Sequence, residues 1–181
     1  IGNDGFAAIR KGIYVDKTEL ISFINGTLGT TNKLTCVSRP RRFGKSFAAK
    51  MLCAYYDKSC ESHALFKGLK IAEDPSFEQY LNQYDVIYLD ITEFTSDAFV
   101  KGTMADVVTN LEQQVIDELC TVYPDIPRQD SLPHMLYSIA DATGNKFIFI
   151  IDEWDALFRE NQRDTFLQES YLRLLRGLFK N

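Results

Sequence analysis

The chain has 181 residues, a net charge of −5 and an apolar fraction of 45%, values that exclude a disordered protein and allow a substantial core. No apolar run approaches the ~18 residues of a membrane-spanning helix, so we expect no membrane partner. The acidic balance argues against a surface that coats nucleic acid, although it leaves room for a local basic site.

Helical and extended patterns alternate along the chain. In chain order they predict a helix over 19–25, a strand over 33–37, a helix from about 47, a strand over 85–90, a long helix over about 101–122, a helix over 131–142, a strand over 147–151 and a helix over about 164–179. Strands that alternate with helices predict a parallel sheet with right-handed crossovers. Three core strands are few for such a sheet, so we expect an incomplete core.

Apolar residues recur on one side of three of these helices, and we expect them to face the core. They are Phe47, Met51, Leu52, Tyr55 and Tyr56; Met104, Val107, Val108, Leu111, Val115, Leu119 and Val122; and Phe166, Leu167, Tyr171, Leu174, Leu175 and Leu178.

Cysteines stand at positions 36, 53, 60 and 120, without a C-x-x-C pair. Cys36 falls in a predicted strand and Cys53 in a predicted helix, where free thiols are commonly buried. This usage favours a reduced, cytoplasmic protein.

Residues 38–46 read Ser-Arg-Pro-Arg-Arg-Phe-Gly-Lys-Ser, between a predicted strand and a predicted helix. A Gly-Lys-Ser at such a turn is typical of a phosphate-binding loop, because helix N-terminal N–H groups attract phosphate oxygens. Lys45 would reach the β- and γ-phosphates, and the Ser46 hydroxyl would ligate Mg²⁺. Arg39 replaces the first glycine of the usual pattern, so a basic turn without a ligand is the alternative. The expected nucleotide-binding residues are Arg41, Arg42, Phe43, Gly44, Lys45, Ser46 and Phe47.

A second motif follows the apolar run Phe147–Ile151, which is typical of a strand buried on both faces. Asp152 and Glu153 end this strand, and ligands of parallel sheets bind outside the carboxyl ends of strands. Asp152 is expected to hold Mg²⁺, and Glu153 to orient and deprotonate a water that attacks the γ-phosphate. Two surface acids at the end of a buried strand are the alternative. Together, the two motifs predict a nucleoside triphosphate as ligand.

Several segments together resemble the AAA-ATPase-like family of bacterial P-loop proteins, over nearly all 181 residues. They are Ile1-Gly2 to Phe6 and Ile9-Arg10, Tyr14-Val15-Asp16-Lys17-Thr18, the variant Walker A at 38–46, Phe66-Lys67-Gly68-Leu69, and the Walker B Ile151-Asp152-Glu153-Trp154-Asp155. In this family the first Walker A glycine is also missing. Trp154 and Ala156-Leu157 depart from the residues that are frequent in the family.

The resemblance implies an α/β fold of the P-loop NTPase type, a three-layer αβα arrangement with a mainly parallel sheet. It implies one ATPase domain over 1–181, with an N-terminal family segment at 1–30 and a partial core at 31–181 that lacks its C-terminal part. Family members are usually longer, and often carry a domain resembling PD-(D/E)XK nucleases. We therefore expect a fragment of a larger protein, with nucleic acid as a partner through such a domain.

Other charged residues have two readings each. Arg39, Arg41 or Arg42 could stabilise charge on the γ-phosphate, or could pair with acids, face solvent or meet nucleic acid. Asp90 could support the attacking water or cap the next segment.

Asp16 and Lys17 could serve the nucleotide pocket or form a structural ion pair. We expect Asp155 to cap or brace the turn after the acid pair. Three arginines could act in trans in a homo-oligomer, although solvated helix faces explain them more simply: Arg159, Arg173 and Arg176.

The sequence thus predicts a Mg²⁺-dependent ATPase, with Glu153 and Lys45 as catalytic residues and Ser46 and Asp152 as metal ligands. ATP rather than GTP follows from the resemblance. The alternative is a nucleotide-binding switch or scaffold with little or no hydrolysis.

Overall fold

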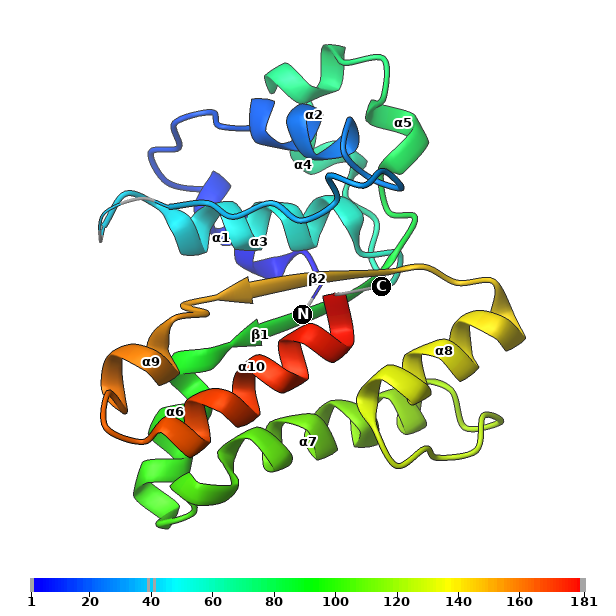
Figure 1. The fold of residues 1–181 in the computed structure, drawn as a ribbon. Helices are drawn as coiled ribbons and strands as arrows, with labels where there is room; N and C mark the ends of the chain where they lie inside the picture. The colour runs from blue at the N-terminus through cyan, green and yellow to red at the C-terminus, as the bar shows by residue number, and fades with distance from the viewer. Residues whose placement is uncertain (1, 39, 41, 180–181) are drawn as a thin grey trace. The chain divides into compact units, whose positions relative to one another are not determined.

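A computed structural model describes residues 2–38, 40 and 42–179 (Figure 1). The chain divides into two compact units, each built from two segments. Unit 1 consists of Ile1–Leu89 and Phe147–Asp152, and unit 2 of Asp90–Lys146 and Glu153–Asn181.

Unit 1 combines a two-stranded sheet with short helices. Its elements are α1 (Asp4–Arg10), α2 (Glu19–Asn25), α3 (Lys45–Tyr56), α4 (His63–Phe66), the 3₁₀ helix η1 (Lys70–Glu73), α5 (Phe77–Tyr80), β1 (Asp85–Asp90) and β2 (Phe147–Asp152). The strands β1 and β2 pair side by side and run parallel (Figure 1).

Helix α3 packs against β2, where Ala49, Cys53 and Ile150 form a small buried cluster. The small side chains Ala49 and Cys53 allow the helix backbone to approach the strand closely. Within unit 1, the first turn of α3 and the carboxyl end of β2 lie on the same side (Figure 1). This packing therefore brings the ends of the two predicted motifs to one side of unit 1.

The larger core of unit 1 is aromatic. Tyr55, Tyr56 and Phe66 are fully or almost fully buried. Asn25, only 4% exposed, satisfies the polar ends of the two tyrosines: its Nδ2 lies 3.1 Å from Tyr55 Oη, and its Oδ1 accepts a 2.7 Å bond from Tyr56 Oη. The core thus keeps its buried hydroxyl groups hydrogen-bonded.

Unit 2 is helical. Its elements are α6 (Ile91–Lys101), the 3₁₀ helix η2 (Met104–Asp106), α7 (Val107–Val122), α8 (Leu132–Thr143), α9 (Ala156–Glu160) and α10 (Thr165–Phe179). Helix α10 packs on α7, α8 and α9, and α6 packs on α7 and α9 (Figure 1).

Most predicted elements are confirmed, including both strands with carboxylate ends and the helices over 19–25, 131–142 and 164–179. The long helix predicted from 101 is wrong at its start, because Gly102 takes a φ of +67° and ends α6. The helices that were not predicted include α1, α6 and α9. Helix α6 begins directly after β1, where the Asp90 side chain accepts bonds from Thr92 N and Glu93 N.

The prediction of a core strand over Lys33–Val37 is wrong for this structure. Residues 33–38 are assigned no regular structure, and Leu34 and Val37 are 63% and 41% exposed. A strand needs a neighbour that pairs with its backbone groups, and β-forming side chains do not supply one. Cys36 is consequently exposed, against the expectation of a buried thiol, whereas Cys53 is buried as expected.

The expected inward faces are wrong at three positions. Phe47, Val122 and Phe166 are 53%, 64% and 77% exposed, although their stripes are otherwise half-buried or buried. Each lies in the first or last turn of its helix, where fewer neighbours cover the stripe. The structure thus supports a mixed α/β class with a two-stranded parallel sheet and mostly helices.

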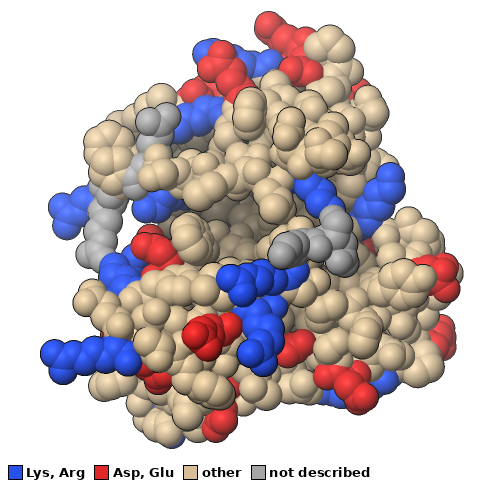
Figure 2. All heavy atoms as spheres, in the orientation of Figure 1, with Lys and Arg blue, Asp and Glu red and all other residues tan. Residues whose placement is uncertain are grey.

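Within the described residues, no helix combines the length and the apolar character required to cross a lipid bilayer. On the face shown in Figure 2, basic and acidic side chains of the described residues are interspersed.

Thiol labelling can test whether residues 33–38, which include Cys36, are exposed in solution. We expect Cys36 to react first with Ellman's reagent in native buffer and to account for about one equivalent of fast reaction. Burial raises the pKa of the Cys53 thiol to about 12, so it should react only after unfolding. The Cys36→Ser variant should lose the fast phase and Cys53→Ala should keep it. A Cys36 thiol that resists labelling would mean that the segment is covered in solution.

Candidate functional site

The Gly-Lys-Ser segment forms the start of a helix. Gly44 is the N-cap residue of α3, Lys45 is its first residue, and Ser46 is its second. The first N–H groups of a helix have no partner within it, and the helix dipole adds positive potential there. This end of α3 therefore has the local geometry that binds a phosphate group.

The backbone conformation explains why a glycine stands at position 44. Gly44 has a φ of +80° and Arg42 a φ of +68°, so the chain turns through the left-handed region twice before the helix. A side chain at position 44 would be strained, and its Cβ would lie 3.4 Å from Lys17 Nζ. Arg42, an expected nucleotide contact, adopts a conformation that is uncommon for a residue with a side chain. Arg39 and Arg41 lie outside the described residues.

The side chain of Lys17 contacts the loop that precedes α3. Its Nζ donates a 3.0 Å hydrogen bond to the carbonyl oxygen of Phe43. An ammonium group therefore lies beside the turn that precedes the helix, in addition to that of Lys45. This position is compatible with the first of the two alternatives for Lys17, a contribution to the nucleotide pocket.

The Lys17 segment is itself anchored to residues 70 and 71. Asp16 Oδ1 accepts bonds from the Thr18 N–H and hydroxyl at 2.9 and 2.7 Å, and Asp16 Oδ2 accepts the Lys70 N–H at 2.9 Å. Fully buried Thr18 accepts the Ile71 N–H at 3.1 Å. Partial burial opposes the charge of Asp16, but these hydrogen bonds outweigh it and lower the pKa of the carboxyl below its usual value.

Asp152 is the last residue of β2 and is only 6% exposed. The Tyr88 hydroxyl of the neighbouring strand lies 3.5 Å from Asp152 Oδ2. A carboxylate so deeply buried at a strand end requires polar or cationic partners.

Glu153 begins the turn between β2 and α9 and belongs to unit 2. Its φ of +49° is unusual for a residue with a side chain, and its carbonyl accepts the Ala156 N–H at 2.9 Å. Its side chain is 26% exposed and forms an ion pair, with Arg159 Nη2 3.0 Å from Glu153 Oε2. Spacing along the chain did not predict this pairing of Glu153 with Arg159.

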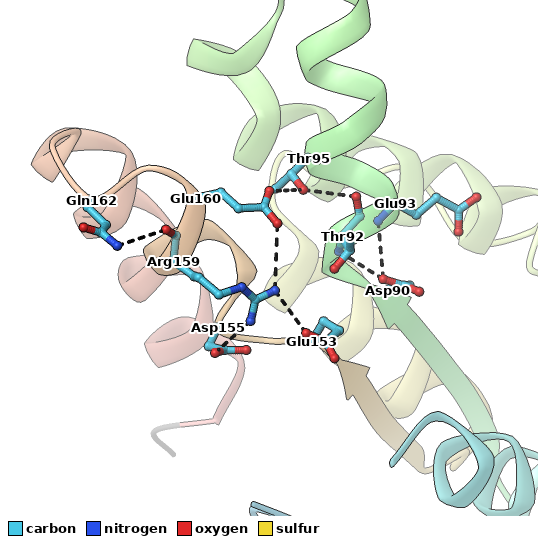
Figure 3. Close-up of polar contacts among 9 residues, drawn as sticks. All are labelled: Asp90, Thr92, Glu93, Thr95, Glu153, Asp155, Arg159, Glu160 and Gln162. Atoms are coloured by element: carbon cyan, nitrogen blue, oxygen red, sulfur yellow. Dashed lines mark hydrogen bonds and ion pairs between the residues drawn. The ribbon is translucent and has the colours of Figure 1, made fainter. Parts of the chain in front are cut away.

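Arg159 also forms ion pairs with carboxylates other than that of Glu153 (Figure 3). Its Nη1 lies 3.0 Å from Asp155 Oδ2, and its Nη2 lies 3.8 Å from Glu160 Oε1. Burial opposes the charge of Arg159, but Asp155 and Glu153 outweigh it and raise the pKa of the guanidinium. Arg159 is thus half-exposed and paired with acids, which a solvated helix face alone does not explain. The i,i+4 spacing of Asp155 and Arg159 was the readable signal.

Two other acids after the strands have local roles. Asp90 caps α6, which supports the second of its two readings. Asp155 is the N-cap residue of α9 and braces the turn through Arg159, as expected. Arg173 and Arg176 are exposed on α10, in agreement with a solvated face.

The expected metal ligands Ser46 and Asp152 are both hard oxygen donors of unit 1. No group of three or more His, Cys, Asp and Glu side chains that could hold a metal occurs within the described part of the chain. Mg²⁺ commonly uses one or two protein oxygens and completes its shell with phosphates and water. The donor types therefore suit Mg²⁺ held together with a nucleotide, rather than a metal held by protein alone.

Comparisons with known proteins give one match. The model of the AAA-ATPase-like family, described as a predicted AAA-ATPase, matches residues 1–181. No curated protein and no solved structure matches the chain.

The hydrogen bonds that Asp16 accepts predict that the stability of the protein depends on pH. Asp16→Asn should lower the free energy of unfolding by about 1–3 kcal/mol near neutral pH, because an amide cannot accept all three bonds. The folded pKa lies below 3.8, so this contribution is complete above 3.8 and is lost as the pH falls through the folded pKa. Urea unfolding followed by circular dichroism should show the difference from wild type at neutral pH and its loss in acid.

Exposed Asp141, on α8, offers the matched control. Asp141→Asn should leave the unfolding curve nearly unchanged at both pH values. Equal stability of Asp16→Asn and wild type at neutral pH would contradict the anchoring role.

Proposed function

The chain belongs to the AAA-ATPase-like family of predicted AAA-ATPases, and from this we propose that it binds and hydrolyses ATP with Mg²⁺. The observation that carries the proposal is the left-handed Gly44 at the start of α3, followed by Lys45 and Ser46 in its first turn. A helix start with this sequence provides amide donors, an ammonium and a hydroxyl for a triphosphate and its metal.

Each residue has a distinct role in this proposal. The loop amides and Lys45 bind the β- and γ-phosphates. Ser46 and Asp152 hold Mg²⁺, which supplies charge neutralisation at the phosphates. Glu153, next to Asp152 in the chain, orients and deprotonates the attacking water.

Three further loop residues belong to the proposed nucleotide site. Phe43 and Phe47 are 60% and 53% exposed on either side of Lys45, where they can cover a bound nucleotide. Exposed Arg42, with its left-handed backbone, is a candidate for stabilising negative charge on the γ-phosphate. Arg41 is proposed for the same loop on sequence grounds alone.

We also propose a P-loop fold of three αβα layers, built as one partial domain over 1–181 within a longer protein. The support is the packing of α3 on a parallel pair of strands. ATP hydrolysis would then regulate an attached domain such as a nuclease, through which nucleic acid would become a partner. All four cysteines are free thiols, which supports a reducing compartment such as the cytoplasm.

A nucleotide-binding switch with little hydrolysis is the second candidate. The observation that favours it is the ion pair of Glu153 with Arg159, because the guanidinium engages an oxygen of the carboxylate that would otherwise contact the attacking water. The two candidates share the nucleotide site and differ in turnover.

Binding tests the nucleotide site directly. Lys45→Met should weaken binding of Mg²⁺-ATP about 10–100-fold, the expected loss of charge-assisted bonds to phosphate. Isothermal titration calorimetry measures this affinity. Lys101→Met is the control, because exposed Lys101 pairs with Asp97 on α6 and should leave binding unchanged. Equal affinity in wild type and Lys45→Met would refute the site.

Turnover separates the enzyme from the switch. Glu153→Gln should keep ATP affinity within about twofold and reduce phosphate release at least about 100-fold, as expected for the loss of a general base. Phosphate release should be followed on the protein at its natural length. Glu118→Gln, at an exposed position of α7, is the control. Absence of turnover in wild type, with normal ATP binding, would establish the switch.

A further inference from the structure

The polar network around Glu153 extends well beyond its ion pair (Figure 3). Arg159 contacts Glu153 through Nη2 and Asp155 through Nη1, both at 3.0 Å. Asp155 and Arg159 are four residues apart, so α9 and its cap hold the guanidinium in place. The planar guanidinium thus bridges two carboxylates of one turn.

The network continues from α9 to α6. Glu160 Oε1 lies 3.8 Å from Arg159 Nη2, and its other oxygen, Oε2, lies 3.1 Å from the Thr95 hydroxyl. Thr95 is 1% exposed and belongs to α6, which packs against α9. A buried hydroxyl on a packed helix therefore fixes the outer end of the network.

The backbone of Glu153 restricts the same side chain. Its left-handed φ of +49° and the bond from Ala156 N to its carbonyl fix where the side chain leaves the chain. Such conformations are uncommon for residues with a side chain and persist where the surroundings hold them. Backbone and guanidinium together define one direction for the carboxylate.

A carboxylate can accept more hydrogen bonds than one ion pair uses. An ionised carboxylate has about four acceptor sites on two oxygens, and Arg159 Nη2 donates its hydrogen bond to Glu153 Oε2. A base that orients water needs a fixed direction, because misplacement of about 1 Å can cost roughly 100-fold in rate.

From these contacts we propose that Arg159 is a positioning residue for Glu153: it holds the carboxylate in the orientation in which Glu153 directs the attacking water. The proposal rests on the proposed ATPase function. Arg159 acts through Glu153 and does not touch the nucleotide. Thr95, Asp155 and Glu160 stabilise Arg159 in turn.

Removal of the guanidinium tests this role. Arg159→Met keeps much of the side-chain length, and should lower kcat about 10–100-fold while KM and the ATP affinity stay within about twofold. Arg159→Lys keeps the charge but cannot bridge two carboxylates, so it should recover part of the rate. Arg176→Met, at an exposed arginine of α10, should match wild type.

A double-mutant cycle shows whether Arg159 acts through Glu153. In single-turnover experiments, Arg159→Met combined with Glu153→Gln should be no slower than Glu153→Gln alone. A merely structural role would add its own loss. Thr95→Val, which removes only the hydroxyl, should lower kcat by a smaller factor of about 2–5, and it carries the test if Arg159→Met fails to fold.

The outcomes separate the two proposals. Wild type without turnover would overturn the ATPase itself. Turnover that Glu153→Gln abolishes, but that Arg159→Met leaves unchanged, would overturn only the positioning role. A faster Arg159→Met variant would overturn it too, and would mean that the ion pair restrains Glu153. Additive losses in the cycle would also reject the role.

Discussion

The packing of α3 on β2 is the constraint on which the proposed nucleotide site depends. Ala49 and Cys53 let the helix lie close to Ile150 of the strand. The helix start that offers amide groups and the strand end that offers a buried carboxylate then fall on one side of unit 1 (Figure 1). A larger side chain at either helix position would displace the first turn relative to Asp152, so core packing would affect the proposed phosphate binding.

Two sets of contacts support the proposed site, and each includes a charged group whose pKa is shifted by its surroundings. Hydrogen bonds lower the pKa of Asp16, which anchors the segment of Lys17 to residue 70, and Lys17 contacts the Phe43 carbonyl in the loop before α3. Carboxylates raise the pKa of Arg159, which holds Glu153. In each case a long side chain reaches a backbone turn that contains a left-handed residue, Gly44 or Glu153. At Glu153, which unlike Gly44 carries a side chain, such a conformation persists only where neighbouring contacts hold it.

Sequence patterns predicted the elements that depend on local signals. The helix Glu19–Asn25 and the strands β1 and β2 appear where apolar runs and polar ends placed them. The segment Lys33–Val37 has a similar local pattern and is not a strand, because pairing depends on a neighbour that the segment cannot specify. Helix α6 was missed because its start lies directly after a strand, although Asp90 is a good cap.

A glycine, a lysine and a serine at a helix start, and two adjacent acids at the end of a strand, are patterns of a few residues and can be read along the chain. The side chains that support them cannot be read in this way: Lys17 reaches the Phe43 carbonyl, and Arg159 reaches Glu153. Those contacts depend on how helices pack and on which way a turn directs its side chain, and both are set by the whole fold rather than by spacing along the chain.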